Sequence, residues 1–577
     1  ACKKSPDGSG ESYAPGPGDE AFQELCKRIF IENVTVDTMT YHSYVKDPAV
    51  TDGIKPAEVS LGHITEEENA KFLKMTQDQL ADLEKIDRST LSEPMQLDYD
   101  VLKYRLELDI ESYDYPYYNE LLGPNNGVPA NIPSSFFDYR ILSEEDVEEY
   151  LILLDDIDRY FDEVIEYEKE RSKRGLFMND TLVDQALEKY RGFIEDPENN
   201  VFITVFEGHL RESLPDLSEE KIAEYVARNK EIVLGSVIPA YEKVIKTLEE
   251  LKGTGKNNGG LANFKDGKGY YEYLVKEYSS SSKTPDELFD YMQNRLDDVI
   301  QDIYSVMGSD PDVYNRYMNV SIPYDDPKEL LDFLRQKTKE TMPQLIDTDY
   351  TLKYVDKSLQ DTNTMAYYIV PPVDYYKDNI IYINPAYNDD LSDNFTTYAH
   401  EGYPGHLYQM TYYLASNPQP VRYTLNFLGY IEGWANTAML KAAYWFDEID
   451  DNVARVMGDE TMYNYGIICL IDYYVNYKGM DVDALMEQFG SLGVSREGME
   501  EIYCYVVEAP ASYYSYGAGA LQWLEIYDRL EESLGDSFDI NDFYTYILPK
   551  GPCTFEKLNE LVDQYIESKS SASKKAA

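Results

Sequence analysis

The stretch YAHEGYPGHLYQ, Tyr398–Gln409, decides how the second half of the chain is built. It holds two of the chain's five histidines, His400 and His406, and Glu401 directly follows the first. The residues before it, 390–399, predict a helix that carries His400. A regular helix turns about 100° per residue, so side chains six residues apart point about 240° apart. On an unbroken helix the two histidines would therefore face different neighbours.

The residues between the two histidines disfavour an unbroken helix. Pro404 lacks a backbone N–H and clashes with the preceding turn of a helix. Gly405 tolerates dihedral angles that other residues avoid. We therefore expect the helix to break or bulge between Gly402 and Gly405, which would allow both histidines to face one point.

Helical periodicity dominates the rest of the chain. Apolar residues recur at three- and four-residue spacing over residues 22–30, 66–85, 92–112, 143–174, 179–194 and 218–251. Two short segments, Ala366–Val370 and Asn379–Asn384, are β-branched and aromatic and predict strands. We expect a mainly α-helical fold with a small β-sheet. It would form one large domain, 19–567, with a helical N-terminal half, about 19–285, and a second half, about 286–567, that carries the histidines.

The two ends of the chain have a different composition from the rest. The chain opens ACKKSPDGSGESYAPGPGDE, in which Cys2 follows a small residue and precedes a polar run rich in Ser, Gly and Pro. This opening resembles a processed bacterial lipoprotein, with a lipid on Cys2 and residues 1–18 as a flexible tether. A cysteine that stands there by chance is the alternative. Residues 568–577 predict a disordered tail. We expect the protein on the extracellular face of the cell membrane, attached only through this lipid.

Charge and cysteine spacing exclude several classes of protein. The 577 residues include 52 basic and 107 acidic ones, a net charge of −55. Nucleic acids and anionic membrane surfaces would be repelled. Either a highly soluble surface or a preference for cationic substrates would explain this charge. None of the five cysteines forms a CxxC pair, which argues against zinc ribbons and thioredoxin-like sites. A disulfide between Cys469 and Cys504 stays open.

Two histidines that face one point could bind a metal ion, and a third candidate ligand follows them in the sequence. Glu432, in YIEGWANTAM, stands 26 residues after His406 and begins another predicted helix. A catalytic zinc site uses three protein ligands and one open position. His400, His406 and Glu432 would complete this set, and Glu401 would accept a proton from water. In a purely structural alternative, the histidines form a hydrogen-bonded helix corner and Glu432 interacts with a helix N-terminus. The remaining histidines are isolated in the sequence and are expected to be structural: His42, His63 and His209.

The motif HEGYPGHLYQ, with EGWAN about thirty residues later, resembles the bacterial family called domain of unknown function 885. The resemblance runs from about Phe22 to about Tyr565 and includes IENVTVDTMTYHSYVKDP, YYIVPPVDYYKDNIIYIN, DYYVNYKGMDVDALMEQF and PASYYSYGAG. This family is grouped with zincin-type metallopeptidases and includes many lipoproteins. The resemblance implies a large zincin-like helical fold with a central cleft. It also implies Zn²⁺ bound by His400, His406 and Glu432, with Glu401 as the general base.

Three further positions are interpreted through the same resemblance. Tyr516 matches the tyrosine of the late signature and would donate a hydrogen bond to the oxyanion of a tetrahedral intermediate. A packed tyrosine, one of 55 in the chain, is the alternative. Ser512 departs from the glutamine of that signature, so the contacts made by that glutamine are in doubt. Asn476 stands where some relatives have histidine, and it is not counted as a ligand.

The predicted second strand suggests a substrate contact. In zincins, an edge strand beside the metal pairs with the extended substrate backbone. The position of this strand in the sequence predicts peptide contacts from Ile381, Tyr382 and Ile383, and a plain buried strand is the alternative.

Residues and resemblance together predict a zinc-dependent peptidase. It would hydrolyse short extracellular peptides with metal-activated water. One alternative is a non-catalytic surface lipoprotein that binds peptides or glycans in the same cleft. Another is a metal hydrolase of non-peptide amides or esters.

Overall fold

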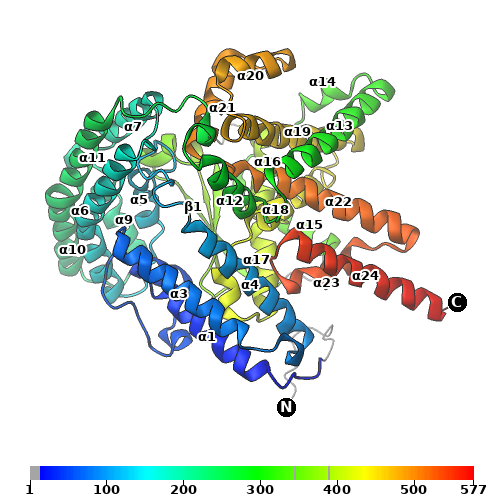
Figure 1. Ribbon diagram of the computed structural model, residues 1–577, viewed down its shortest axis with the longest axis horizontal. Helices are drawn as coiled ribbons and strands as arrows, with labels where there is room; N and C mark the ends of the chain where they lie inside the picture. Colours follow the sequence, from blue (N-terminus) through cyan, green and yellow to red (C-terminus); the bar gives the residue numbers. More distant parts are fainter. Residues whose placement is uncertain (1–12, 344–345, 388–389, 577) are drawn as a thin grey trace.

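The computed structural model describes residues 13–343, 346–387 and 390–576 (Figure 1). Cys2, the predicted lipid site, lies outside the described residues. Helices make up most of the fold, and one small sheet accompanies them, which confirms the predicted mainly helical class. Among the described helices, none is long and apolar enough to cross a membrane.

The first part of the chain is helical throughout. Its helices are α1 (Asp19–Val34), α2 (Thr38–Tyr44), α3 (Glu66–Glu84), α4 (Glu93–Ser112), α5 (Val128–Phe137), α6 (Glu144–Lys173), α7 (Asp180–Phe193), α8 (Val201–Thr204), α9 (Phe206–Ser213), α10 (Glu219–Ile232), α11 (Ile238–Leu251) and α12 (Gly267–Ser279). The periodic segments predicted from the sequence correspond to α1, α3, α4, α6, α7 and the α10–α11 pair. Helix α6 begins where Ser143 and Asp146 form a reciprocal capping box, so its start is determined locally.

The second part adds the helices that carry the site. They are α13 (Pro285–Ser309), α14 (Val313–Tyr317), α15 (Pro327–Thr341), α16 (Leu391–Glu401), α17 (His406–Ala415), α18 (Leu428–Ala443), α19 (Asp451–Asn476), α20 (Val482–Phe489), α21 (Arg496–Glu508), α22 (Gly517–Leu534), α23 (Ile540–Ile547) and α24 (Phe555–Ala576). Helix α24 includes residues 568–576, where the sequence predicted a disordered tail. The alanines and lysines there have high helix propensity.

A three-stranded sheet lies among these helices. Its strands are β1 (Asp349–Tyr354), β2 (Ala366–Ile369) and β3 (Asp378–Ile383), in the order β1-β3-β2. β1 is parallel to β3, whereas β2 is antiparallel to it. β2 and β3 confirm the two predicted strands. β1 escaped prediction because its sequence, DYTLKY, lacks a run of β-branched residues and is largely polar.

The sheet order corrects the predicted substrate contacts. β3 is the central strand, so both of its edges already pair with neighbours. Ile381 and Ile383 are fully buried, and Tyr382 is 4% exposed. The prediction that these three residues contact a peptide is therefore wrong. The two edge strands of the sheet are β1 and β2.

Apolar side chains gather in distinct cores. One core joins α1 and α4 to α16–α18 and α22–α24, so the beginning of the chain packs on its end. A second core is formed by α5–α11, which curve along one side of the molecule in Figure 1. The site described below lies on helices of the first core.

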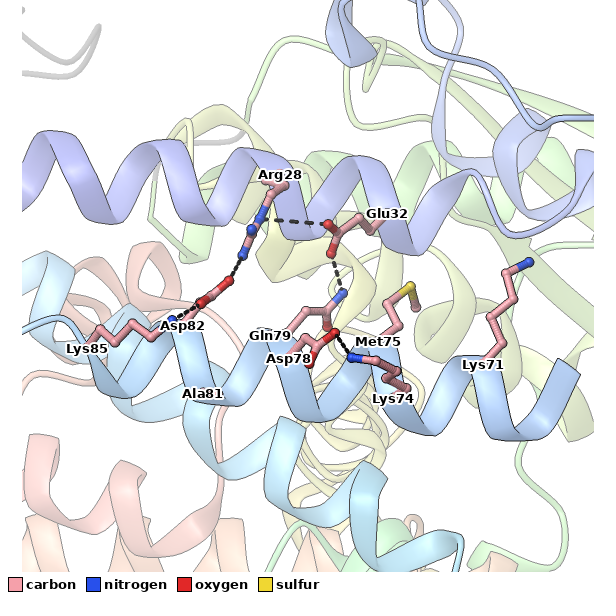
Figure 2. A pocket seen from close by; sticks show the side chains of 10 residues that line it. All are labelled: Arg28, Glu32, Lys71, Lys74, Met75, Asp78, Gln79, Ala81, Asp82 and Lys85. Carbon is pink, nitrogen blue, oxygen red and sulfur yellow. Dashed lines mark hydrogen bonds and ion pairs between the residues drawn. The ribbon is translucent and has the colours of Figure 1, made fainter. Parts of the chain in front are cut away.

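A surface cavity of about 460 Å³ lies between α1 and α3 (Figure 2). Most of its charged side chains pair with one another, and Lys71 pairs with Glu68. Arg28 lies 2.6 Å from Asp82, and Lys74 lies 2.7 Å from Asp78. Glu32 accepts a hydrogen bond of 2.8 Å from Gln79. Because these groups satisfy each other, they do not indicate a ligand in this cavity.

Candidate metal centre

The predicted break separates two helices at the histidine motif. α16 ends at Glu401 and α17 begins at His406, and Gly402 and Gly405 adopt non-helical backbone angles. The turn brings the His400 and His406 rings to a centroid distance of 4.5 Å, with an angle of 86° between their planes. The prediction of a break between Gly402 and Gly405 is confirmed, and the two histidines face one point.

Glu432 reaches the same point from helix α18. Its Oε2 lies 3.2 Å from Nε2 of His400 and 3.2 Å from Nε2 of His406. One ligand atom from each of the three residues lies within 4.8 Å of the others. The structure thus brings together all three residues that the sequence predicted as ligands.

Close helix packing positions Glu432. A Cβ added at Gly433 would lie 2.3 Å from the backbone of Gly519, and one at Gly519 would lie 2.3 Å from the carbonyl of Gly429. The missing side chains allow α18 and α22 to touch backbone to backbone. Asn436, one turn beyond Glu432, donates a hydrogen bond of 3.3 Å to the carbonyl of Tyr516. Helix α18 therefore fixes both Glu432 and the residue that precedes α22.

Glu401 lies beside this cluster. Its Oε1 is 3.9 Å from Nε2 of His400. Its Oε2 accepts a hydrogen bond of 2.9 Å from the backbone N–H of Tyr368, on the edge strand β2. The side chain of Glu401 is 15% exposed, so water can reach it. The sequence did not indicate the contact with Tyr368, because any residue offers a backbone N–H.

The two glutamates experience opposite electrostatic environments. Burial raises the pKa of Glu401 to about 7; the Glu432 charge adds to this, and His400 opposes it. Burial also acts to raise the pKa of Glu432, but the charges and hydrogen bonds of His406 and His400 outweigh it and hold that pKa far below its usual value. Glu432 therefore remains an anion between two imidazoles, whereas Glu401 can exchange a proton near neutral pH.

Two tyrosines lie against the cluster. The Tyr516 ring is 6.5 Å from the His400 ring, and its pKa is raised by burial and by the charges of Glu432 and Glu401. The ring of Tyr465, from α19, stacks on that of Tyr516 with centroids 6.0 Å apart. Burial and the charges of Glu432 and Glu401 raise the pKa of Tyr465 as well. Sequence reasoning selected Tyr516 and missed Tyr465, since nothing distinguishes one tyrosine of α19 from the others in that helix.

The three ligand residues fit a zinc ion. Nitrogen and oxygen ligands bind zinc at about 2.0–2.2 Å, which separates them from one another by roughly 3.3–3.5 Å in a tetrahedral site. Both histidine–glutamate separations, 3.2 Å, lie just below this spacing. Two imidazoles and one carboxylate form a set of ligands used by catalytic zinc sites.

Other residues singled out in the sequence have structural contacts. Asn476 is fully buried and bonds Leu261, Asp472 and Val506, which agrees with leaving it out of the ligand set. The hydroxyl of Ser512 bonds Tyr505 at 3.3 Å. Cys469 and Cys504 are free thiols, so the disulfide left open by the sequence is not formed.

We expect Gly405→Ala to disrupt the site. The new Cβ would lie 1.8 Å from the carbonyl oxygen of His400 and 2.5 Å from that of Ala399, so α17 must move away from α16. We expect a loss of about 3 kcal/mol or more in the free energy of unfolding, together with loss of zinc binding. Denaturant unfolding and metal analysis measure the two effects. Gly208→Ala is the matched control, because its Cβ would enter open space. Unchanged zinc binding in Gly405→Ala would contradict this role.

A hydrogen bond from Tyr367 connects β2 to the buried carboxyl group of Asp138. Tyr367 donates a hydrogen bond of 3.1 Å to Asp138, and burial raises the pKa of Asp138 from 3.8 to about 7. The native state then holds this proton more tightly than the unfolded chain. The contribution of Asp138 to the free energy of unfolding is therefore fully present below about pH 4 and is lost as the pH rises through about 7.

We expect Asp138→Asn to remove this pH dependence. Relative to wild type, the variant should gain up to roughly 4 kcal/mol between pH 4 and pH 8, from about three pKa units at 1.4 kcal/mol each. Unfolding curves at both pH values measure the difference. The exposed Asp216→Asn is the control and should show no such change. A stability difference that does not vary with pH would contradict the prediction.

The chain resembles a bacterial protein family and the solved structures of two bacterial proteins. A family described as "Bacterial protein of unknown function (DUF885)" matches residues 49–562. A crystal structure from Colwellia psychrerythraea, provisionally described as a lipoprotein, has a TM-score of 0.80 at 17% identity, covering 95% of this chain and 99% of that one. A similarly described protein of unknown function from Shewanella oneidensis has a TM-score of 0.64 at 14% identity, covering 94% and 99%. No curated protein matches the sequence significantly. At these identities the likeness concerns the fold.

Proposed function

This chain belongs to the bacterial DUF885 family of unknown function, and we propose that it is a zinc-dependent peptidase that acts on short peptides. One observation carries the proposal. His400, His406 and Glu432 converge within 4.8 Å, and the carboxylate of Glu401 lies beside them. Metallopeptidases need this combination of three ligands and a nearby base.

In the proposed reaction, the side chains divide the work. His400, His406 and Glu432 would hold Zn²⁺, which when bound polarises a peptide carbonyl and lowers the pKa of water. Glu401 accepts a proton from the attacking water and passes it to the departing amine. The Tyr368 N–H keeps the Glu401 carboxylate turned toward His400. Tyr516 donates its hydroxyl proton as a hydrogen bond to the oxygen on which negative charge develops.

The direct test combines metal analysis with digestion. Purified protein should contain close to one zinc in this site, and it should cleave members of a peptide library. A parallel panel of non-peptide amides and esters distinguishes a peptidase from another hydrolase. If zinc is absent, or if His400→Ala leaves digestion unchanged, the proposal fails.

We expect Tyr516→Phe to lower kcat by about 10²-fold with little change in KM and no loss of zinc, because one donor to the developing oxyanion is removed. Peptide hydrolysis kinetics measure this. Tyr514→Phe is the matched control, since its hydroxyl contacts Tyr271 at 3.2 Å and belongs to a buried pair. A Tyr516→Phe enzyme with wild-type kcat would assign Tyr516 to packing.

We also propose that a lipid on Cys2 attaches the protein to the outer face of the cell membrane. The order of residues at the start of the chain supports this, as do the descriptions of both structural relatives. Labelling with a fatty-acid analogue tests it. Label that persists in Cys2→Ser would exclude this attachment.

A further inference from the structure

A second group of candidate metal ligands lies apart from the first. It consists of His42 on α2 and of Asp146 and Glu149 in the first turns of α6. One ligand atom from each lies within 4.8 Å of the others. In the sequence, His42 is isolated and was expected to be structural. The fold brings it to two carboxylates about a hundred residues away.

The imidazole of His42 is held in one orientation. Its Nε2 lies 2.6 Å from the carbonyl oxygen of Arg140, so Nε2 carries the hydrogen and Nδ1 keeps its lone pair. The ring stacks on Tyr139 with centroids 4.0 Å apart and an angle of 8°. Burial lowers the pKa of His42, which keeps the imidazole neutral at physiological pH and able to act as a ligand.

Each carboxylate is likewise held through one oxygen. Oδ2 of Asp146 accepts the backbone N–H groups of Leu142 and Ser143, at 2.8 and 2.9 Å. Oε2 of Glu149 accepts the hydroxyl of Tyr139 at 3.3 Å. The other oxygen of each group is left for a further partner. Ligands that are fixed by outer hydrogen bonds are typical of metal sites in proteins.

The spacing leaves room for an ion. Nδ1 of His42 is 4.0 Å from Oδ1 of Asp146, which is too far for a hydrogen bond. It is also about half an ångström longer than the distance between two ligand atoms bound to one zinc ion. The nearby cation Lys55 pairs with Glu145 at 3.2 Å, and its charge also acts to lower the pKa of Glu149. The positive charge of Arg140 lowers the pKa of His42, and the opposing effect of the Asp146 charge is larger.

We propose that His42, Asp146 and Glu149 bind a divalent transition-metal ion, such as Zn²⁺, that ties α2 to the start of α6. An imidazole ligand favours such an ion over Ca²⁺, which prefers six to eight oxygen ligands. This site is independent of the proposed peptidase reaction, and its ligands belong to other elements.

Titration of the full chain with ZnCl₂, followed by calorimetry and by metal analysis after dialysis, tests the proposal. Wild type should bind two equivalents, and His406→Ala should keep the one assigned here. Glu149→Gln retains an acceptor for Tyr139 but should weaken this equivalent at least tenfold, leaving the other unchanged. Glu166→Gln is the matched control, because it removes an exposed carboxylate from the same helix away from the proposed ligands and should keep both equivalents. CaCl₂ should not replace zinc.

Two results would overturn the proposal. One is a wild-type protein whose only zinc disappears with His406→Ala. The other is a second equivalent of zinc that remains bound in both Glu149→Gln and His42→Gln, or that binds to wild type only at millimolar zinc. Should either variant fold poorly, as circular dichroism would show, the stoichiometry of wild type and of His406→Ala still decides. A failed peptidase assay does not bear on this site.

Discussion

Glu401→Gln should lower kcat/KM for peptide hydrolysis by about 10³-fold or more while the protein keeps its zinc. The amide cannot accept a proton, and general-base catalysis contributes roughly 10²–10⁴-fold. The amide oxygen can still accept the hydrogen bond from the Tyr368 N–H, so the position of the side chain should be preserved. Peptide kinetics and metal analysis on the same preparation measure the two properties.

The exposed Glu448→Gln is the control for a change of charge elsewhere in this half of the chain. It should retain both activity and zinc. If Glu401→Gln were as active as Glu448→Gln, Glu401 would not be the base, and the proposed reaction would lose its proton acceptor.

Glu432→Gln should have the opposite profile. The carboxylate lies 3.2 Å from both imidazoles, and its negative charge is the only one that the ligand set provides. A neutral amide is a much poorer zinc ligand, so we expect zinc affinity to fall by about 10²-fold or more, and activity to fall with it. Dialysis against defined free zinc, followed by metal analysis, measures the affinity.

Excess zinc separates the two variants. It should restore part of the activity of Glu432→Gln, whose defect is binding, and none of the activity of Glu401→Gln, whose defect is proton transfer. Full zinc content in Glu432→Gln at low free zinc would remove Glu432 from the ligand set and leave two histidines without a third partner.

Several features of the fold were predictable because their causes are local. The periodic apolar residues of 143–174 and the capping pair Ser143 and Asp146 specify α6 with little help from distant contacts. The break in HEGYPGH was predictable for the same reason. Pro404 and Gly405 act on neighbouring backbone, and helical geometry alone excludes a shared site without a break.

The errors concern contacts between distant segments. The segment NIIYIN reads as a strand, but nothing in it reveals that β1 and β2 occupy both of its edges. Its assignment as the substrate strand was therefore wrong. Tyr465 and the Tyr368 N–H were missed because their importance comes only from what lies opposite them.

The sequence by itself determined a mainly helical chain, the location of its strands β2 and β3, and a turn that makes two histidines face one point. These follow from periodicity, capping and backbone sterics within a few residues. Only the tertiary structure placed Glu432 within 3.2 Å of both histidines, because α18 packs against α16 and α17. It also brought His42 to Asp146 and Glu149. Such contacts depend on packing between segments far apart in the chain, and local sequence patterns do not encode this packing.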